Sequence, residues 1–182
     1  MTHNQHGILT TEASIIFPHF TERGELHSKY MEGDRFYIVE KKPYDLIDFN
    51  LRLSGTSLKG AVEGAHVVLG SGTMTPVVLS KKHSIYWTPI MSPKSPHCIW
   101  VSLAHIRKFV KNKKGEVTVY LKNESTVDLP CSYYKFERRI SRAYTLRYKI
   151  ESNADQVVKV AEPYLKTYYI RKKLGLNYEV EE

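Results

Sequence analysis

Two groups of side chains in this sequence could carry chemistry: a few cysteines and histidines, and a large set of cations. The cysteines are Cys98 and Cys131, and His97 and His105 flank the first of them. Because His97 and Cys98 are adjacent, a strand would not let both reach one tetrahedral zinc ion, and there is no Cys-x-x-Cys pair. The sequence also gives no acid–base dyad in this region. We therefore expect no metal site, no cofactor and no enzymatic activity.

The enzymatic alternative is a hydrolase that uses Cys98 or His105. A nucleophilic cysteine needs a nearby base that removes the thiol proton, and His105 could serve Cys98 in that way. Nothing else in the sequence supports this pair, so small, reduced, buried thiols are the simpler interpretation. Intact activity after Cys98→Ala would count against the hydrolase.

A glycine-rich segment, GTSLKG at Gly55–Gly60, has a partial likeness to a nucleotide phosphate loop. The GxxxxGK[ST] spacing is absent, because Lys59 precedes Gly60 and Ala61 follows it. Nucleotide hydrolysis is therefore not expected. The glycines would instead let the backbone approach a phosphate or another strand closely. Lys59 and the nearby Arg52 could then contact the phosphate.

The cations are concentrated in the later part of the chain. The formal net charge is +8, with 27 Lys and Arg against 19 Asp and Glu. Residues 1–50 hold five Lys and Arg against eight Asp and Glu, so residues 51–182 hold the remaining 22 against 11. This asymmetry favours a polyanionic partner, most often a nucleic acid, over charge that serves solubility alone.

The strongest basic segment is a predicted helix that follows Ser132, a suitable N-cap, and runs from Tyr133 to about Ile150. At 100° per residue, five cations fall within an arc of about 100°: Lys135, Arg138, Arg139, Arg142 and Lys149. The apolar arc, of about 120°, faces away from them: Tyr133, Phe136, Ile140, Ala143, Tyr144 and Ile150. Arg147 falls inside the apolar arc, where it pairs with a buried acid unless the helix ends earlier. A stripe of cations without acids suits phosphates, and the alternative is a solvated helix face.

A second basic segment is a predicted β-hairpin. Cys98–Val110 has extended character with a bend near Leu103–Ala104, Lys111–Gly115 is a turn signal, and Val117–Leu121 alternates apolar with polar residues. Pro130 is expected to end the hairpin. Five cations lie at its tip: Arg107, Lys108, Lys111, Lys113 and Lys114. A basic β-ribbon can enter a groove or straddle a nucleic-acid backbone, whereas the alternative is an exposed turn whose lysines discourage edge pairing.

These segments require an α+β fold, with several short, mostly antiparallel strands, a basic β-hairpin and C-terminal helices. Short strands are expected at Ala13–Phe20, Arg35–Lys41, Ile47–Leu53, Val67–Leu69, Pro76–Leu79 and Ser84–Trp87, with a small-residue loop at Ser54–Gly64. A second helical stretch is expected over Asp155–Leu174, interrupted by Pro163. We expect a flexible N-terminus at 1–10, a DNA-binding domain at 11–151 and a C-terminal helical tail at 152–182. No export signal or membrane-spanning run is present, so we expect a cytoplasmic protein with no membrane partner.

Three stretches together resemble the ComK family. The first is LRLSGTSLKG, which matches an Arg-x-x-Gly-Ser-Ser-x-x-Gly loop at Arg52, Gly55, Thr56, Ser57 and Gly60. The second is SPHCIWVSLAHIRKF, which matches a Pro-x-Cys-x-Trp-[Ile/Val]-Ser segment at Pro96, Cys98, Trp100, Val101 and Ser102. The third is LPCSYYKFERRISRAYTLR, which matches a Leu-Pro-x-Ser-Tyr-x-x-Phe-Glu segment at Leu129, Pro130, Ser132, Tyr133, Phe136 and Glu137. They occur in the family's order over about residues 30–150.

The resemblance implies a sequence-specific DNA-binding transcriptional activator of competence (DNA-uptake) genes. Family members bind A/T-rich double-stranded DNA boxes, largely through the minor groove, as homo-oligomers on paired sites, and help RNA polymerase engage promoters. An adaptor delivers them to a Clp protease. Here the aromatic-Met-Leu-Tyr-Pro element for adaptor docking is absent from the tail, where Glu162–Leu165 is a poor substitute. Ala61 and Val62 stand where the family often carries a base, and Lys59 would compensate.

The alternative binding function is an RNA-binding or ribosome-associated module that uses the same basic surface on single strands. Such a module needs exposed aromatic rings beside the cations, on which bases can stack. Tyr134 and Tyr148 are the candidates in this sequence. Competition between duplex and single-stranded nucleic acid separates the two functions.

Overall fold

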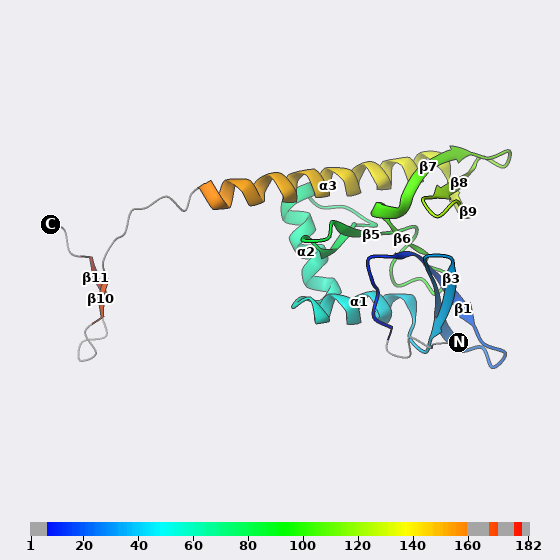
Figure 1. The fold of residues 1–182 in the computed structure, drawn as a ribbon, viewed down its shortest axis with the longest axis horizontal. Helices are drawn as coiled ribbons and strands as arrows, with labels where there is room; N and C mark the ends of the chain where they lie inside the picture. Colours follow the sequence, from blue (N-terminus) through cyan, green and yellow to red (C-terminus); the bar gives the residue numbers. More distant parts are fainter. Residues whose placement is uncertain (1–6, 160–167, 171–176, 180–182) are drawn as a thin grey trace. The chain divides into compact units, whose positions relative to one another are not determined.

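The fold comes from a computed structural model that describes residues 7–159, 168–170 and 177–179. Two compact units are present, one extending to Glu151 and the other beginning at Ser152. The first unit combines antiparallel strands with helices, which confirms the predicted α+β class (Figure 1). The second unit contains a two-stranded antiparallel pair, β10 (Tyr168–Ile170) and β11 (Asn177–Glu179).

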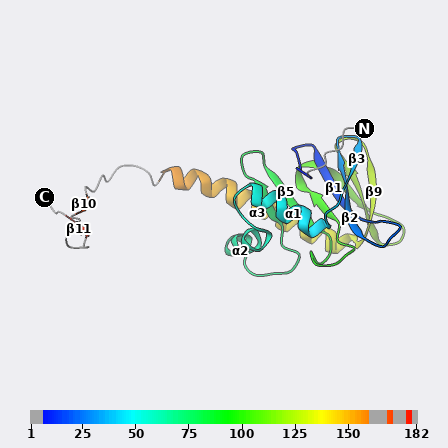
Figure 2. The ribbon, with the colours of Figure 1, turned by 90° about the horizontal axis from the view of Figure 1, so that it is seen from below.

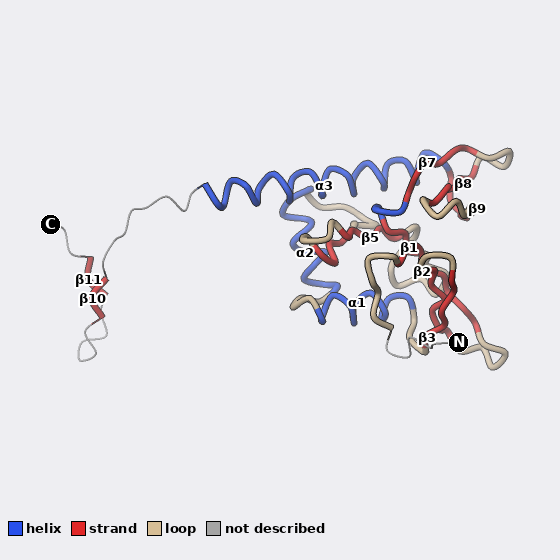
Figure 3. Tube along the Cα trace, viewed as in Figure 1, coloured by secondary structure: helices blue, strands red, loops and turns tan. Residues whose placement is uncertain are grey.

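The largest element of the first unit is a six-stranded sheet in the order β3-β2-β1-β6-β5-β4. Every neighbouring pair in it is antiparallel. The strands are β1 (Ala13–Phe20), β2 (Leu26–Glu32), β3 (Arg35–Val39), β4 (Val77–Ser80), β5 (Ile85–Pro89) and β6 (Trp100–Ser102). Figure 3 shows these strands in red. The predicted strand at Ala13–Phe20 is confirmed, and those near Arg35, Pro76 and Ser84 are confirmed with shifted ends.

A short 3₁₀ turn, η1 (Leu103–His105), leads from β6 into a second, three-stranded sheet in the order β7-β8-β9. Its strands are β7 (Ile106–Lys111), β8 (Glu116–Leu121) and β9 (Thr126–Ser132). The predicted bend near Leu103 and the hairpin with its turn at 111–115 are therefore confirmed. Pro130 does not end the hairpin, because it lies within β9. An edge strand tolerates proline, since one side of its backbone has no ladder partner.

Helices replace three of the elements expected early in the chain. Ile47–Leu53 lies within α1 (Pro43–Leu53) instead of forming a strand. Proline in the first turn and Asp45 beside the helix N-terminus favour this helix, and its buried residues recur at helical spacing. The expected loop at Ser54–Gly64 and strand at Val67–Leu69 both fall largely within α2 (Leu58–Leu69). The side chain of Ser57 caps α2 by accepting from the Gly60 N–H at 3.1 Å.

The last helix, α3, covers Tyr133–Lys159 and begins directly after Ser132, as predicted. It continues past Ile150 to Lys159 without a break, so the residues from Asp155 to Lys159 are helical as expected but belong to α3 and not to a separate second helix. Residues 168–170 form strand β10 instead of helix, in keeping with the preference of Tyr and Ile for extended structure. Pro163, Leu174 and the Glu162–Leu165 stretch lie outside the described residues.

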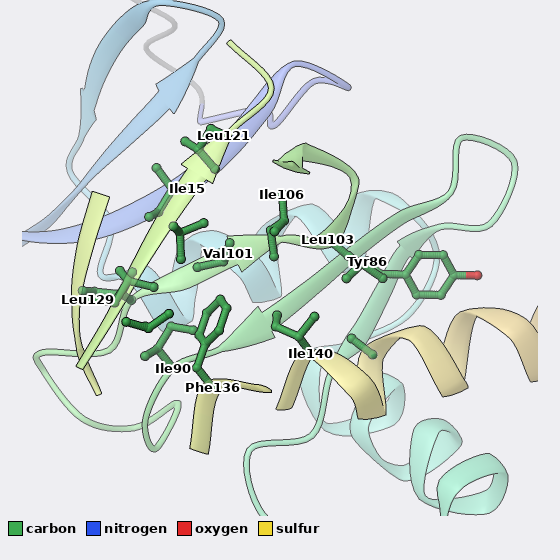
Figure 4. Close-up of a cluster of buried hydrophobic side chains, with 14 of the residues drawn as sticks. Ile15, Tyr86, Ile90, Val101, Leu103, Ile106, Leu121, Leu129, Phe136 and Ile140 are labelled. Atoms are coloured by element: carbon green, nitrogen blue, oxygen red, sulfur yellow. The ribbon is translucent and has the colours of Figure 1, made fainter. Parts of the chain in front are cut away.

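Two hydrophobic clusters cover the two faces of the six-stranded sheet, because successive residues of a strand point to opposite faces. Ile15 belongs to the cluster that contacts the β7–β9 sheet and α3, and Ile16 belongs to the one that contacts α1. Phe136 and Ile140 of α3 join the first cluster, in which Phe136 lies beside Ile90 (Figure 4). Helix α3 thus lies on one side of the large sheet and α1 on the other, at the top and at the bottom of Figure 1, and in the view from below in Figure 2 α1 lies in front of α3.

Candidate nucleic-acid interface

The tip of the β7–β8 hairpin is a rigid turn rather than a loose loop. Gly115 has φ +80°, a conformation that glycine adopts without strain. The side-chain oxygen of Asn112 accepts from the backbone N–H groups of Lys114 and Glu116, at 3.0 Å each. The backbone N–H of Tyr133 donates to the Gly115 carbonyl at 3.2 Å. The turn is therefore fixed directly to the first residue of α3.

A cation–π contact also links the hairpin to α3. The Lys111 ammonium nitrogen lies 5.2 Å from the ring centroid of Tyr134. On the hairpin itself, Lys108 is paired across the strands with Tyr120, and its ammonium nitrogen lies 4.6 Å from that ring. Contacts of this kind hold long, flexible lysines in place while their charges stay near the surface. The cations of the hairpin are thus partly pre-ordered.

The hairpin turn, β9, the segment after β5 and the start of α3 line an open pocket of about 370 Å³. Lys114 lines it from the turn, while Lys135 and Arg139 line it from α3. Glu116 and Cys131 also contribute to the wall. Two basic segments that are separated by β8 and β9 in sequence therefore meet around one hollow, which the sequence alone did not reveal.

The cations of α3 do not form the single solvent-facing stripe that the sequence predicts. Over residues 133–152, where the burial of α3 is described, the buried side chains are Phe136, Ile140, Ala143 and Leu146. Leu146 lies about 20° from Lys135 on the helical projection, inside the expected cationic arc. Its burial turns one edge of that arc towards the protein body. Tyr144, expected on the apolar face, is instead 48% exposed.

Arg139 and Arg142 consequently fold against the protein body. Arg139 donates from Nη1 to the Ile90 carbonyl. The guanidinium of Arg142 lies against Gly72 in the segment between α2 and β4. Both side chains are partly buried, which corrects the prediction that they lie on the solvent arc. Lys149 stays exposed but donates from Nζ to the Val68 carbonyl at 3.1 Å, near the C-terminal end of α2.

Arg147 pairs with an acid, as the sequence led us to expect. Its Nε lies 3.0 Å from Oε1 of Glu151, one helical turn further on. The same Glu151 oxygen accepts from the Ser84 hydroxyl at 2.9 Å. Both side chains of the ion pair are partly exposed rather than buried.

Eight of the predicted DNA-binding residues are exposed around the hairpin and along α3: Arg107, Lys108, Lys111, Lys113, Lys114, Lys135, Arg138 and Lys149. Within the part of the chain that the structure describes, no ion pair joins any of these to a carboxylate. Among these residues, no ion pair therefore neutralises their charges.

Arg52 and Lys59 lie apart from this surface. Arg52 lies in the last turn of α1, and its Nε is 2.6 Å from Oδ2 of Asp48, while Nζ of Lys59 in α2 lies 3.8 Å from Oε1 of Glu63. The other carboxylate oxygen of Asp48 accepts from the Leu58 N–H at 2.7 Å. Burial alone would raise the pKa of Asp48, but the hydrogen bonds from Arg52 and Leu58 lower it below the ordinary value. In the described structure both cations are therefore engaged in i,i+4 ion pairs.

The geometry gives no support to a thiol nucleophile. Burial raises the pKa of Cys98 to about 11, so its thiol stays protonated at neutral pH. Nε2 of His105 lies 2.7 Å from the Thr11 carbonyl and donates to it. Burial also raises the pKa of Cys131, although Arg139 opposes the shift. Among the described residues, no group of three or more His, Cys, Asp or Glu side chains could hold a metal ion.

The aromatic candidates for base stacking are both accessible. Tyr134 is 67% exposed and Tyr148 is 73% exposed. Tyr134 already carries Lys111 over its ring, whereas the structure gives Tyr148 no ring or cation contact within the described part of α3. Among the described residues, no helix is long and apolar enough to cross a membrane.

Comparison with known proteins assigns the chain to a family. The family model described as ComK protein matches residues 4–155. A curated protein of Bacillus subtilis (strain 168), named competence transcription factor, is 30% identical over 135 residues, which cover 74% of this chain and 70% of that protein. No solved structure matches the chain. The match extends over both basic segments and the glycine-rich segment, and the chain belongs to the ComK family.

Proposed function

We propose that this protein is a cytoplasmic, nucleoid-associated transcription factor that binds A/T-rich double-stranded DNA and activates competence genes. Membership of the ComK family and the name of the Bacillus subtilis relative support the regulatory role. The net charge of +8 supports a polyanionic partner. This function uses no metal, cofactor or catalytic residue.

One observation carries the DNA-binding proposal: the hairpin tip and the start of α3 form one cationic surface. Lys114 lines the same pocket as Lys135 and Arg139, and Lys111 rests on Tyr134. A fixed turn beside a fixed helix presents charges at set positions, so that little conformational freedom is lost when phosphates bind. Cations in this arrangement would displace condensed counterions from a duplex, which is the main source of sequence-independent affinity.

The contacts that we propose fall into two groups. The tip residues Lys113 and Lys114 reach phosphates on one side of a groove, while Lys135 and Arg138 hold the backbone from the helix. Arginine suits this role because its planar donors match phosphate oxygens. Phosphate contacts position a protein but do not read sequence. We propose that a minor groove supplies the A/T preference, through width and the absence of the guanine amino group.

Further partners follow from the family resemblance as proposals. We propose that copies of the protein assemble on paired boxes and assist RNA polymerase at the promoter. We also propose that an adaptor delivers the protein to a Clp protease. The adaptor would need a docking element other than the one that is missing from the tail. Arg52 and Lys59 would contact DNA only after leaving Asp48 and Glu63, so we propose that their contribution is secondary.

A second candidate function, binding of single-stranded RNA, is favoured by the exposed rings of Tyr134 and Tyr148. Successive bases stack on such rings with little regard to sequence. The two functions differ in their preferred competitor. If single-stranded RNA displaces A/T-rich duplex DNA from the protein at equal nucleotide concentration, that result favours the second function.

The test is a gel-shift titration of the full chain against an A/T-rich duplex and against a G/C-rich duplex of equal length. The double variant Lys114→Ala/Lys135→Ala should bind both duplexes more weakly, because these lysines act on phosphates. The matched control, Lys82→Ala, removes an exposed lysine from the β4–β5 turn, which lies outside the proposed surface. Equal losses in the double variant and in the control, per charge removed, would show that net charge alone drives binding.

A further inference from the structure

Arg142 has an unusual environment for a surface-helix arginine. Its Nε and Nη2 atoms are buried and have no hydrogen-bond partner among the described residues. These two nitrogens form the edge of the guanidinium that grips phosphates and carboxylates with two parallel hydrogen bonds. The neighbouring Arg139 differs, because it donates to the Ile90 carbonyl. Arg142 thus holds a charged donor edge away from both water and acceptors, which is costly.

The segment that covers this edge joins α2 to β4. A Cβ placed on Gly72 would lie 2.8 Å from Nη2, 2.9 Å from Nη1 and 3.0 Å from Cζ of Arg142. The guanidinium is therefore packed directly on the Gly72 backbone. Only a residue without a side chain allows this close packing. The backbone conformation itself would accept alanine, because the φ of Gly72 lies outside the left-handed region.

The same segment is held in place by a small hydrogen-bond network that excludes Arg142. Nε2 of His66 lies 3.2 Å from the Gly72 carbonyl and 2.8 Å from the Thr75 hydroxyl. Thr75 also donates to the Gly72 carbonyl at 3.2 Å. The Gly72 carbonyl is thus already used by His66 and Thr75. Met74, at φ 52°, lies in the left-handed region that residues other than glycine rarely adopt, so the segment stores some backbone strain.

The other side of Arg142 faces the proposed DNA-binding surface. Arg138 lies one turn earlier on α3 and Thr145 one turn later, and both are exposed. A guanidinium that left Gly72 would therefore move next to Arg138, on the outer face of the helix. There it would be repelled by the other cations unless a phosphate were present.

We propose that the segment at residues 70–76 is a latch that holds Arg142 away from phosphate in the free protein, and that DNA binding releases this arginine to a backbone phosphate. The proposal rests on the DNA-binding function proposed above. In the free protein the latched state predominates. The apparent affinity for DNA is then the affinity of the unlatched state multiplied by the fraction of molecules that are unlatched. A change that disfavours the latch should therefore tighten DNA binding.

Gly72→Ala is the decisive variant, because its methyl group would occupy the place of the guanidinium. We expect it to raise the affinity for an A/T-rich duplex by roughly threefold to tenfold without changing the salt dependence. Arg142→Ala should weaken binding and reduce the slope of log Kd against log salt by about 1, as for the loss of one phosphate contact. In the Arg142→Ala background, Gly72→Ala should have no effect on affinity.

The matched control is Gly64→Ala in α2, where an added Cβ has no atom within 4 Å. It should leave DNA affinity unchanged. An increase in affinity with Gly72→Ala that persists in the Arg142→Ala background would overturn the latch. So would a Gly72→Ala protein that binds DNA as the wild type does or more weakly, which is the result expected if Arg142 only supports the segment.

A second readout does not need DNA. Phenylglyoxal modifies accessible arginines, and the modified residues can be found by mass spectrometry of the full chain. In the free wild-type protein Arg142 should react several-fold more slowly than Arg138, and Gly72→Ala should abolish this difference. Equal rates for the two arginines in the wild type would contradict the latch. Failure of the wild type to bind any duplex, with the labelling difference intact, would instead refute the proposed function and the release by DNA, although the segment at residues 70–76 would still be shown to shield Arg142.

Discussion

The Lys111 ammonium nitrogen lies 5.2 Å from the centre of the Tyr134 ring, and this contact joins the β7–β8 hairpin to the first turn of α3. The two residues belong to segments that the sequence presents as separate basic features. In the fold they form one edge of the cationic surface, next to the pocket that Lys114, Lys135 and Arg139 line. The position of the hairpin tip relative to the helix should therefore depend on this ring.

Replacement of Tyr134 tests that dependence. Tyr134→Ala should weaken binding to an A/T-rich duplex several-fold, because Lys111 loses the ring that holds it. Tyr134→Phe keeps the ring face and should bind nearly as the wild type does. The stability loss in the alanine variant should be small, about 0.5–1 kcal/mol for an exposed cation–π contact. Titrations by fluorescence anisotropy, with melting temperatures on the same samples, measure both effects. Equal binding by the phenylalanine and alanine variants would remove the ring from the proposed surface.

The tip lysines should govern the salt dependence of binding. If each contacts one phosphate, Lys113→Ala and Lys114→Ala should each reduce the slope of log Kobs against log salt by about 0.9. Their effect should be similar on specific and non-specific duplexes, because phosphates carry no sequence information. Affinity that stays tight and independent of salt in the wild type would remove the electrostatic argument altogether.

The proposed choice of groove can be tested without changing the protein. Inosine–cytosine pairs present a minor groove like that of A/T pairs but a different major groove. A box in which inosine–cytosine replaces A/T should therefore bind with nearly unchanged affinity, as measured by competition gel shift. Guanine–cytosine replacement, which adds an amino group to the minor groove, should reduce binding. Loss of binding on the inosine box would contradict the minor-groove proposal.

The strands and the hairpin could be predicted because their signals are local. Alternation along Val117–Leu121 and the turn at 111–115 define β7 and β8, and Ala13–Phe20 is bounded by polar residues. Helix α1 was missed because Ile47–Leu53 contains apolar residues at both helical and extended spacings. The deciding signals, Pro43 and Asp45, lie just upstream of that window.

The cationic face was predicted only in part, because one buried leucine decides how α3 is turned. Leu146 lies among the cations on the helical projection, and its complete burial places Arg139 and Arg142 against the body. A projection that includes every apolar residue would have found this shift. The contact with Gly72 could not be predicted, since it depends on the tertiary position of the segment after α2.

Residues of α3 that we propose to contact DNA differ from those that stabilise the fold, and substitutions should distinguish the two groups. Arg138→Ala should weaken DNA binding but change stability by less than about 0.5 kcal/mol, because the side chain is exposed. Phe136→Ala and Ile140→Ala remove buried side chains and should cost roughly 2–5 kcal/mol through lost burial and a cavity. Chemical denaturation and DNA titration on the three variants measure the two effects. Wild-type affinity in Arg138→Ala would mean that this part of the helix is only solvated surface.

The final prediction concerns the pH dependence of the α1–α2 corner. Asp48 accepts hydrogen bonds from Arg52 and from the Leu58 N–H, and its folded-state pKa lies below the ordinary value of 3.8. A group whose pKa falls on folding stabilises the native state above its unfolded pKa, and this stabilisation is lost as the pH drops through the folded value. Asp48→Asn should therefore cost stability at pH 6, about 0.3–0.5 kcal/mol, because asparagine keeps an oxygen that can accept from the Leu58 N–H but loses the charge that pairs with Arg52. The difference between the two proteins should shrink as the pH falls below 3.8 and through the lower folded-state pKa, because wild-type Asp48 becomes protonated. Urea denaturation at a series of pH values from 6 downwards, with Glu63→Gln as a control for a more exposed i,i+4 carboxylate, measures the effect. A stability difference that stays constant over this series would show that the charge of Asp48 does not stabilise this corner.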